Sequence, residues 1–193
     1  MLPATARVHE IVSGVEPWDD LEAGQRSDVL RWLASDDDVF RRARPATPPR
    51  HLVSYAVLVD AARAAMLLVD HRDAGLHLPA GGHVDAGEDP AETALREARE
   101  ELGVRAAFLP AIGDRPLLVS QSRTVGRSAG HTDVCLWYVL AGDALAPLDG
   151  DAREFAGWRW WTFDEVLAAD PAVLDPHLPR FTAKLTGALA AST

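Results

Sequence analysis

The chain has 193 residues, of which 48% are hydrophobic, so it is long enough to bury a core as one domain with additions. A formal net charge of −10 at pH 7 argues against a broad nucleic-acid surface, although phosphate-bearing small molecules can still bind together with cations. A single cysteine, Cys135, excludes both an intrachain disulfide framework and a cysteine-rich zinc site.

The sequence also predicts no membrane partner. It contains no run of about 18 consecutive apolar residues, which is the length needed to span a bilayer. The N-terminal residues lack the basic and apolar regions of a secretory signal. We therefore expect a cytoplasmic location.

Residues 1–44 are expected to form an N-terminal helical cap that packs on the rest of the chain or on a second subunit, which predicts a homodimer. Helices are expected over residues 9–15 and 21–33, and a third, short helix is expected to follow Ser35 and end at Arg42. Residues 45–50 form a proline-rich connector, which is stiff and extended. A second domain is then expected over residues 51–193.

The connector is followed by a predicted β-hairpin. Residues 52–59 and 65–70 have the apolar patterns of two strands, and residues 60–63 make the turn between them. A loop then leads through residues 76–79 into a glycine-rich stretch.

The next helix is predicted over residues 90–102. Asp89 is a favourable N-cap, Pro90 suits the first helical position, and Gly103 is a natural C-terminal stop. Glu92 lies three residues after Asp89, so the pair is also expected to form a capping box.

Two faces of this helix have different chemistry. Apolar residues recur at helical spacing and predict a buried stripe: Ala91, Ala94, Leu95, Ala98 and Leu102. Glu97, Glu100 and Glu101 share an adjoining face. Three carboxylates so close together repel one another unless a cation lies among them, and oxygen ligands suit Mg²⁺ or Mn²⁺.

The pattern Gly82-x5-Glu88-x7-Arg96-Glu97-Ala98-x-Glu100-Glu101-x-Gly103-Val104 resembles the Nudix box, GX5EX7REUXEEXGU, where U is a bulky aliphatic residue. Every fixed position matches, and Ala98 is smaller than the usual residue at its position. The resemblance to this MutT-like family implies an α/β (α+β) fold, an α/β/α sandwich around a mixed curved sheet. It also implies Mg²⁺-dependent hydrolysis of a nucleoside diphosphate linked to another group, by attack of water on phosphorus.

The same resemblance implies roles for individual residues. Glu97, Glu100 and Glu101 would be metal ligands, and one of them would also accept the proton of the attacking water. Arg96 would pair with Glu88. The implied catalytic residues are Glu88, Arg96, Glu97, Glu100 and Glu101. Two further metal ligands are implied in addition to the glutamates of the helix. They are the carbonyl of Gly81 and Glu154, which lies in the loop before the last strand. Asp151 is a weaker substitute for Glu154.

The rest of the chain completes the sheet. Strands are expected over residues 106–112, 117–123 and 132–140, with a last strand around residues 158–161. Thr162 is expected to cap a short helix over residues 163–168, and a final helix is expected over residues 179–190.

Four polar residues are candidates for substrate binding: Arg72, His83, His131 and Asp133. His131 and Asp133 share one strand face with Cys135 and Trp137, which suits the mouth of a cleft. Each residue also has an alternative interpretation without a role in binding. Arg72 could form a surface ion pair, His83 could be exposed to solvent, and His131 and Asp133 could simply lie at the edge of a strand.

Two other functions compete with hydrolysis. One is a nucleotide-metabolite-sensing Nudix module without catalysis, and the other is an enzyme resembling isopentenyl diphosphate isomerase. The intact box favours a hydrolase over both, and the chain contains neither a GxSxG motif nor a Walker A loop. The proline or tyrosine that marks relatives acting on ADP-ribose or dinucleoside polyphosphates is missing around residues 119–122, so the substrate remains a small nucleotide diphosphate of unspecified identity.

Overall fold

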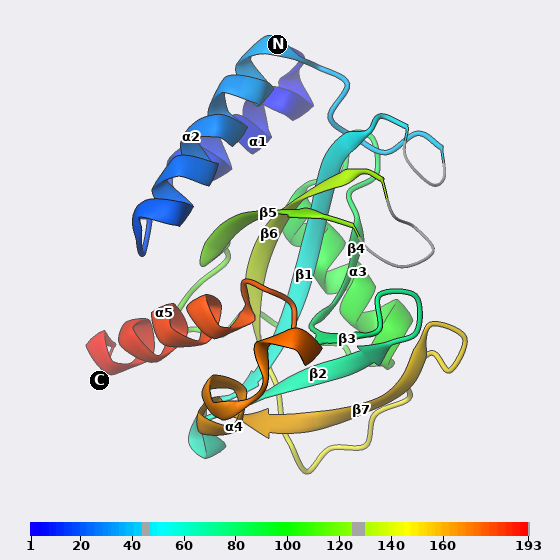
Figure 1. Ribbon diagram of the computed structural model, residues 1–193, viewed down its shortest axis with the longest axis vertical. Coiled ribbons are helices and arrows are strands. Elements are labelled where there is room, and N and C mark those ends of the chain that lie inside the picture. The colour runs from blue at the N-terminus through cyan, green and yellow to red at the C-terminus, as the bar shows by residue number, and fades with distance from the viewer. Residues whose placement is uncertain (44–46, 125–129, 193) are drawn as a thin grey trace.

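A mixed, curved β-sheet organises the chain, which a computed structural model describes over residues 1–43, 47–124 and 130–192 (Figure 1). Neighbouring strands follow the order β3-β2-β1-β6-β5, with β4 also paired to β1 and β7 to β2. Among the strand pairs of these described residues, β1–β6 is parallel and the others are antiparallel. The strands are β1 (Arg50–Asp60), β2 (Ala65–His71), β3 (Leu76–Leu78), β4 (Ala80–His83), β5 (Leu118–Arg123), β6 (Thr132–Ala141) and β7 (Phe155–Thr162).

The long strand β1 has two different antiparallel partners along one side. Its C-terminal end pairs with β2, where Val59 faces Met66, whereas its N-terminal half pairs with β4, where Tyr55 faces Gly81. This split brings the glycine-rich stretch of β4 beside the centre of the sheet. The sheet therefore positions residues 80–83 for contact with the helix that follows them.

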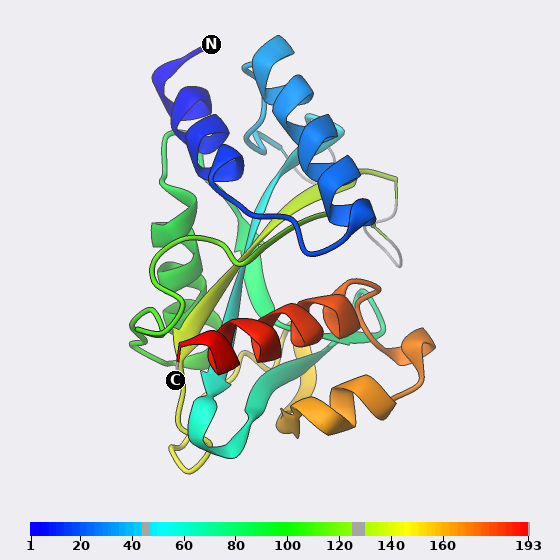
Figure 2. The same cartoon turned by 90° about the vertical axis from the view of Figure 1, so that its left-hand side faces the viewer.

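Helices cover both faces of the sheet, so the expected α/β/α sandwich is confirmed. One buried cluster joins the sheet to α3 (Pro90–Leu102), α1 (Pro3–Ser13) and α2 (Asp20–Ser35). The other joins the sheet to α4 (Phe163–Ala168) and α5 (Leu178–Ala191). Figure 2 separates the α1–α2 pair, in blue, from α4 and α5, in orange and red.

The N-terminal helices are tied to the domain by buried charges. Glu22 of α2 is fully buried, accepts a hydrogen bond from the backbone N–H of Val119 and pairs with Lys184 Nζ of α5 at 2.9 Å. Asp19, the N-cap of α2, pairs with Arg180 of α5. The extension thus packs on the sheet and on the last helix.

Two expected elements are absent, and the helix expected over residues 9–15 is α1, which spans Pro3–Ser13. Ser35 ends α2 instead of capping a further helix, because Asp36 is extended and its carboxylate accepts the N–H of Asp38, which makes a turn. Residues 106–112 form no strand beyond the single bridge of Phe108 to Leu140, since the chain turns through hydrogen bonds to the Leu109 carbonyl. The short strands β3 and β4 were not expected.

The predicted bounds of α3 are confirmed. Asp89 caps it and Gly103 ends it with a left-handed φ of 69°. The capping box with Glu92 is wrong: Asp89 accepts from the N–H of Ala91, and its second oxygen pairs with Arg7 of α1. None of the helices in the described residues has the length and apolar content to cross a bilayer.

Candidate active site

Helix α3 lies beside β4 (Figure 1), and its glutamate face meets the glycines of that strand. Glu97 is buried, Glu101 is partly buried, and the Glu100 side chain is 51% exposed. The acidic face therefore runs from the interior to the solvent at the rim of the apolar stripe, as the helical spacing predicts.

Two glycines of β4 allow this close approach. The backbone N–H of Gly81 donates to Glu101 Oε2 at 2.9 Å. A Cβ atom on Gly82 would overlap the carboxylate of Glu97, and one on Gly81 would overlap the backbone of Ser54 and Tyr55. A side chain at Gly82 would therefore displace the Glu97 carboxylate, and one at Gly81 would collide with the neighbouring strand β1.

Arg96 connects the loop before α3 to the glutamates, and its expected ion pair with Glu88 is present. Its Nε and Nη2 donate to the two oxygens of Glu88, each at 3.0 Å. Its Nη1 donates to Glu97 at 2.6 Å and to Glu100 at 3.2 Å. Glu88 also accepts from the Thr93 hydroxyl, so the guanidinium is held in one place while it partly neutralises two glutamates.

The carboxylates are crowded, and two of them lie mostly within the protein. Burial, the charge of Glu97 and a hydrogen bond with Glu154 raise the pKa of Glu101 to about 9. Burial also raises the pKa of Glu97, although Arg96 opposes this shift. Negative charge is thus disfavoured until a cation neutralises it, and a cluster of oxygen donors of this kind fits a hard divalent ion.

A cleft of about 720 Å³ opens over these carboxylates. Arg72 lines it, as does Arg153, which the sequence analysis did not single out. Asp151 also lines it, but its hydrogen bonds with Arg153 hold the pKa of Asp151 at about 2. Glu154 therefore joins the carboxylate cluster, whereas Asp151 is paired with an arginine.

A smaller pocket of about 250 Å³ adjoins the cleft, and both are lined by Gly81, Gly82 and His83. His131 and Asp133 line only the smaller pocket. Tyr55 and Asp175 also line it, and the Tyr55 hydroxyl donates to the carboxylate of Asp175 at 3.3 Å. Burial raises the pKa of Asp175.

The predicted residues thus fall into two neighbouring groups. The first group lines the cleft and consists of Arg72, Gly81, Arg96, Glu154 and the three helix glutamates. Glu88 does not line the cleft but holds Arg96 through an ion pair. The pocket residues Tyr55 and Asp175 were missed, since they are 120 positions apart in sequence and nothing local marks them. Arg153 was missed because an arginine in an exposed loop is ordinary.

Comparison with known proteins agrees with this geometry. The NUDIX domain family matches residues 49–185. An RNA pyrophosphohydrolase of Rhodospirillum rubrum is 33% identical over 117 residues, which cover 57% of this chain and 70% of that protein. The asymmetrical bis(5'-nucleosyl)-tetraphosphatase of Mus musculus is 45% identical over 65 residues, which cover 33% of this chain and 42% of that protein.

Solved structures show the same fold. A NUDIX-family hydrolase from Clostridium perfringens has a TM-score of 0.53 at 20% identity, covering 75% of this chain and 99% of that one. An Ap4A hydrolase from C. elegans has a TM-score of 0.55 at 16% identity, covering 72% and 98%. The chain belongs to the Nudix family. It is accordingly a hydrolase of pyrophosphate bonds, from a family that generally uses a divalent metal.

Proposed function

We propose that this hydrolase cleaves, with Mg²⁺, the diphosphate linkage of a small nucleotide, either a nucleoside triphosphate or a nucleotide-linked metabolite. The observation that carries the proposal is the cluster of Glu97, Glu101 and Glu154 against the Gly81–Gly82 backbone, at the wall of a cleft large enough for a polyphosphate. Buried carboxylates with raised pKa values in a cleft are candidates for catalytic chemistry.

The proposed metal ligands are carboxylates and one carbonyl: Glu97, Glu100, Glu101, Glu154 and the carbonyl of Gly81. Mg²⁺, or Mn²⁺ in its place, would neutralise the charge of the diphosphate oxygens and activate a bound water. The oxygen donors fit this ion because Mg²⁺ prefers few carboxylates together with water and substrate phosphates.

In the proposed reaction, a water oxygen bonds to phosphorus while the bond from that phosphorus to the bridging oxygen breaks. One of Glu97, Glu100 and Glu101 accepts the proton of the water, and the bridging oxygen leaves with the departing phosphate. Arg96 holds the glutamates in place through its contacts with Glu88 and Glu97. Arg72 lies in the cleft, where a guanidinium can pair with the phosphates.

The smaller pocket is the proposed position of the nucleoside. Its walls combine the Tyr55 ring and aliphatic side chains with polar groups that include His83, His131 and Asp133, and it opens beside the cleft. This combination of an apolar wall with a few polar groups is typical of small-molecule sites. We propose a small nucleotide in preference to RNA because the net charge of −10 opposes a long polyanion.

A substrate panel tests the proposal directly. The protein would be incubated with Mg²⁺ or Mn²⁺ and one substrate at a time, and release of mononucleotide would be measured. The panel contains NTPs, dNTPs, ADP-ribose, nucleotide sugars and dinucleoside polyphosphates. Reaction in H₂¹⁸O identifies the attacked phosphorus, because ¹⁸O appears in the product that carries it. Glu97→Gln, Glu100→Gln and Glu101→Gln should each lower turnover, whereas Glu92→Gln, on an exposed position of the same helix, should not.

Two results would contradict this function. Binding of a nucleotide without any turnover would support the sensing module instead. Isomerisation of an isopentenyl diphosphate would support the isomerase-like alternative.

We also propose that residues 1–44 act as a cap on a Nudix domain spanning residues 51–193, joined by the connector at 45–50, and that the protein acts in the cytoplasm. Deletion of the cap would expose Lys184 and the apolar surface under α1 and α2, so the truncated chain should lose stability. The homodimer expected through the cap is tested by sedimentation equilibrium of the full chain, and a monomer at all concentrations would contradict it.

A further inference from the structure

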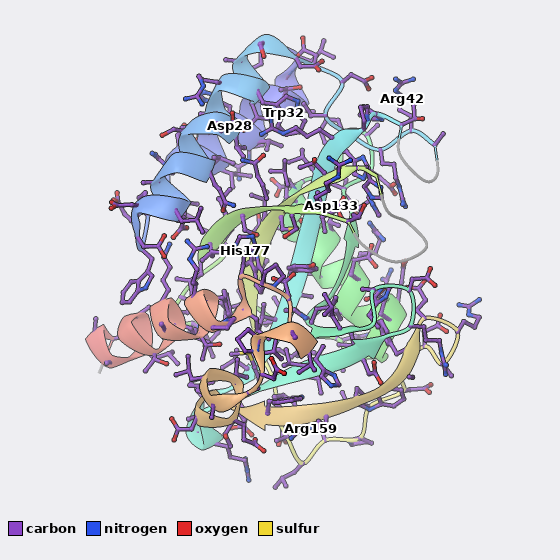
Figure 3. All side chains as sticks on the ribbon, in the orientation of Figure 1. Asp28, Trp32, Arg42, Asp133, Arg159 and His177 are labelled. Carbon is purple, nitrogen blue, oxygen red and sulfur yellow. The ribbon has the colours of Figure 1, made fainter. Side chains whose placement is uncertain are left out.

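Three histidines and an aspartate converge at one end of the sheet from segments far apart in the sequence. His51 of β1 stands in register with Asp133 of β6, and His83 of β4 pairs with Val53 two residues further along β1. His131 immediately precedes β6. One side-chain nitrogen or oxygen from each of the four residues lies within 4.8 Å of all the others. Figure 3 labels Asp133 at this upper end of the sheet.

The orientation of His51 indicates a ligand. Its side chain is fully buried, and its Nδ1 lies 2.7 Å from the Pro48 carbonyl oxygen, so Nδ1 donates a hydrogen to that oxygen. Within the described residues, no group is aligned to hydrogen-bond His51 Nε2 or Asp133 Oδ1, although the two atoms are 3.2 Å apart. Two buried polar atoms without an aligned partner are unfavourable, and a cation bound between them would remove that cost.

His131 is held in a similar way. Its Nδ1 lies 3.2 Å from the Thr124 hydroxyl oxygen, and that hydroxyl donates its own hydrogen to the His131 carbonyl. The remaining nitrogen, Nε2, lies 3.3 Å from Asp133 Oδ1. In metal sites, a ligating histidine usually donates its other N–H to an oxygen that fixes the ring. His51 shows this arrangement with the Pro48 carbonyl, and the Thr124 hydroxyl oxygen is placed to accept in the same way from His131 Nδ1.

We propose that His51, His83, His131 and Asp133 form a transition-metal site, separate from the glutamate cluster, that binds Zn²⁺. Three imidazoles and one carboxylate suit zinc, whereas Mg²⁺ prefers oxygen ligands. Tetrahedral Zn²⁺ with bonds of about 2.0–2.1 Å needs ligand atoms about 3.4 Å apart. The separations of 3.2 and 3.3 Å to Asp133 already match, and the remaining pairs of ligand atoms, which lie within 4.8 Å, would need to close to this distance when an ion binds.

The proposed ion would link β4 to β1 and β6. His83 follows the Gly81–Gly82 segment directly, and its carbonyl accepts from Arg96 Nη2 at 3.3 Å. A metal bond to the His83 ring would therefore hold one wall shared by the pocket and the cleft. His83, His131 and Asp133 line the pocket, which gives an ion access from solvent.

The test uses the full chain purified without metal and titrated with Zn²⁺ or with Co²⁺ as a spectroscopic probe. We expect one equivalent of Co²⁺ to give the visible absorption spectrum of a tetrahedral site. The X-ray absorption spectrum of the Zn²⁺ form should show three imidazole ligands. Excess Mg²⁺ should not displace the ion. Zn²⁺ should also raise the melting temperature.

Matched variants separate this site from the glutamates. Loss of a residue that only orients a metal ligand typically weakens metal binding by about 10–100-fold. Asp133→Asn and His131→Gln each remove a proposed ligand, so they should weaken Zn²⁺ binding by more than this. The triple variant Glu97→Gln/Glu100→Gln/Glu101→Gln and the control His9→Gln on α1 should bind Zn²⁺ normally. If wild-type protein binds no Co²⁺ in tetrahedral form, or if binding is lost in the glutamate variant and kept in Asp133→Asn, the proposal is wrong.

Discussion

The backbone N–H of Gly81 donates to Glu101 Oε2 at 2.9 Å, so a strand and the box helix are joined at the carboxylate whose pKa is raised to about 9. A Cβ atom on the neighbouring Gly82 would overlap the Glu97 carboxylate, and one on Gly81 would overlap the backbone of Ser54 and Tyr55. The contact of Gly81 with Glu101 places the crowded glutamates at the edge of a cleft instead of on a freely solvated helix face.

Gly82→Ala should reduce turnover strongly. The added methyl group would overlap the Glu97 carboxylate and displace it, and a misplacement of about 1 Å in a catalytic site can cost about 100-fold. Steady-state kinetics with the best substrate of the panel would measure the change. Gly24→Ala in α2 is the matched control, because the added Cβ atom would have no neighbouring atom within 4 Å. This variant should keep its activity, and its free energy of unfolding should rise by about 1 kcal/mol. Normal turnover of Gly82→Ala would contradict the proposed role of Glu97.

Arg96→Ala should lower turnover by about 10–100-fold, the range found when residues that orient metal ligands are removed. The substitution removes the bidentate partner of Glu88 and the contact with Glu97 at 2.6 Å. Arg96→Lys should recover only part of the rate, since an ammonium cannot contact both oxygens of Glu88 and also Glu97. An unchanged rate for Arg96→Ala would show that the ion pair is dispensable.

The metal-free protein should lose stability as the pH rises. The pKa of Glu101 is raised in the folded state to about 9 from an ordinary value of 4.5, so its protonated form favours the folded state. That contribution is fully present below pH 4.5 and is lost as the pH rises through about 9. Urea denaturation in chelator at several pH values measures this slope, which Glu101→Gln should flatten.

Adding Mg²⁺ should counteract this loss of stability at alkaline pH. A cation binds the ionised carboxylates of the folded chain, so its affinity should increase with pH as protons are released. The same slope with and without Mg²⁺ would contradict a metal site at Glu101.

Glu22→Gln should destabilise the fold by about 3 kcal/mol, since it leaves the buried ammonium of Lys184 without a countercharge. Burial already lowers the pKa of Lys184. The double variant Glu22→Gln/Lys184→Met should recover part of the loss, and a double-mutant cycle by urea denaturation gives the coupling energy. Arg42→Ala, which breaks an exposed pair with Asp38, should leave the stability almost unchanged. Additive effects of the two buried substitutions would show that the pair does not hold the cap.

Local signals predicted the box helix well. Asp89, Pro90 and Gly103 are cap and stop residues whose effect depends on their neighbours within one turn, and α3 has the expected bounds. The capping box was placed on the wrong helix, because Asp89 pairs with the distant Arg7, whereas Thr162 and Glu165 of α4 form a capping box. The strand expected over residues 106–112 is wrong because the chain turns at Leu109 after two hydrogen bonds with β6, and apolar alternation does not encode that turn.

By itself, the sequence determined the helix, its glutamate face and the Arg96–Glu88 pair, because all depend on helical spacing or a fixed box pattern. Tertiary structure decided that Glu101 accepts from the Gly81 N–H, that Glu154 and not Asp151 reaches the same cluster, and that His51 faces Asp133. The physical reason is sheet pairing: the parallel register of β1 with β6 joins residues about 80 positions apart, and no local pattern specifies that register.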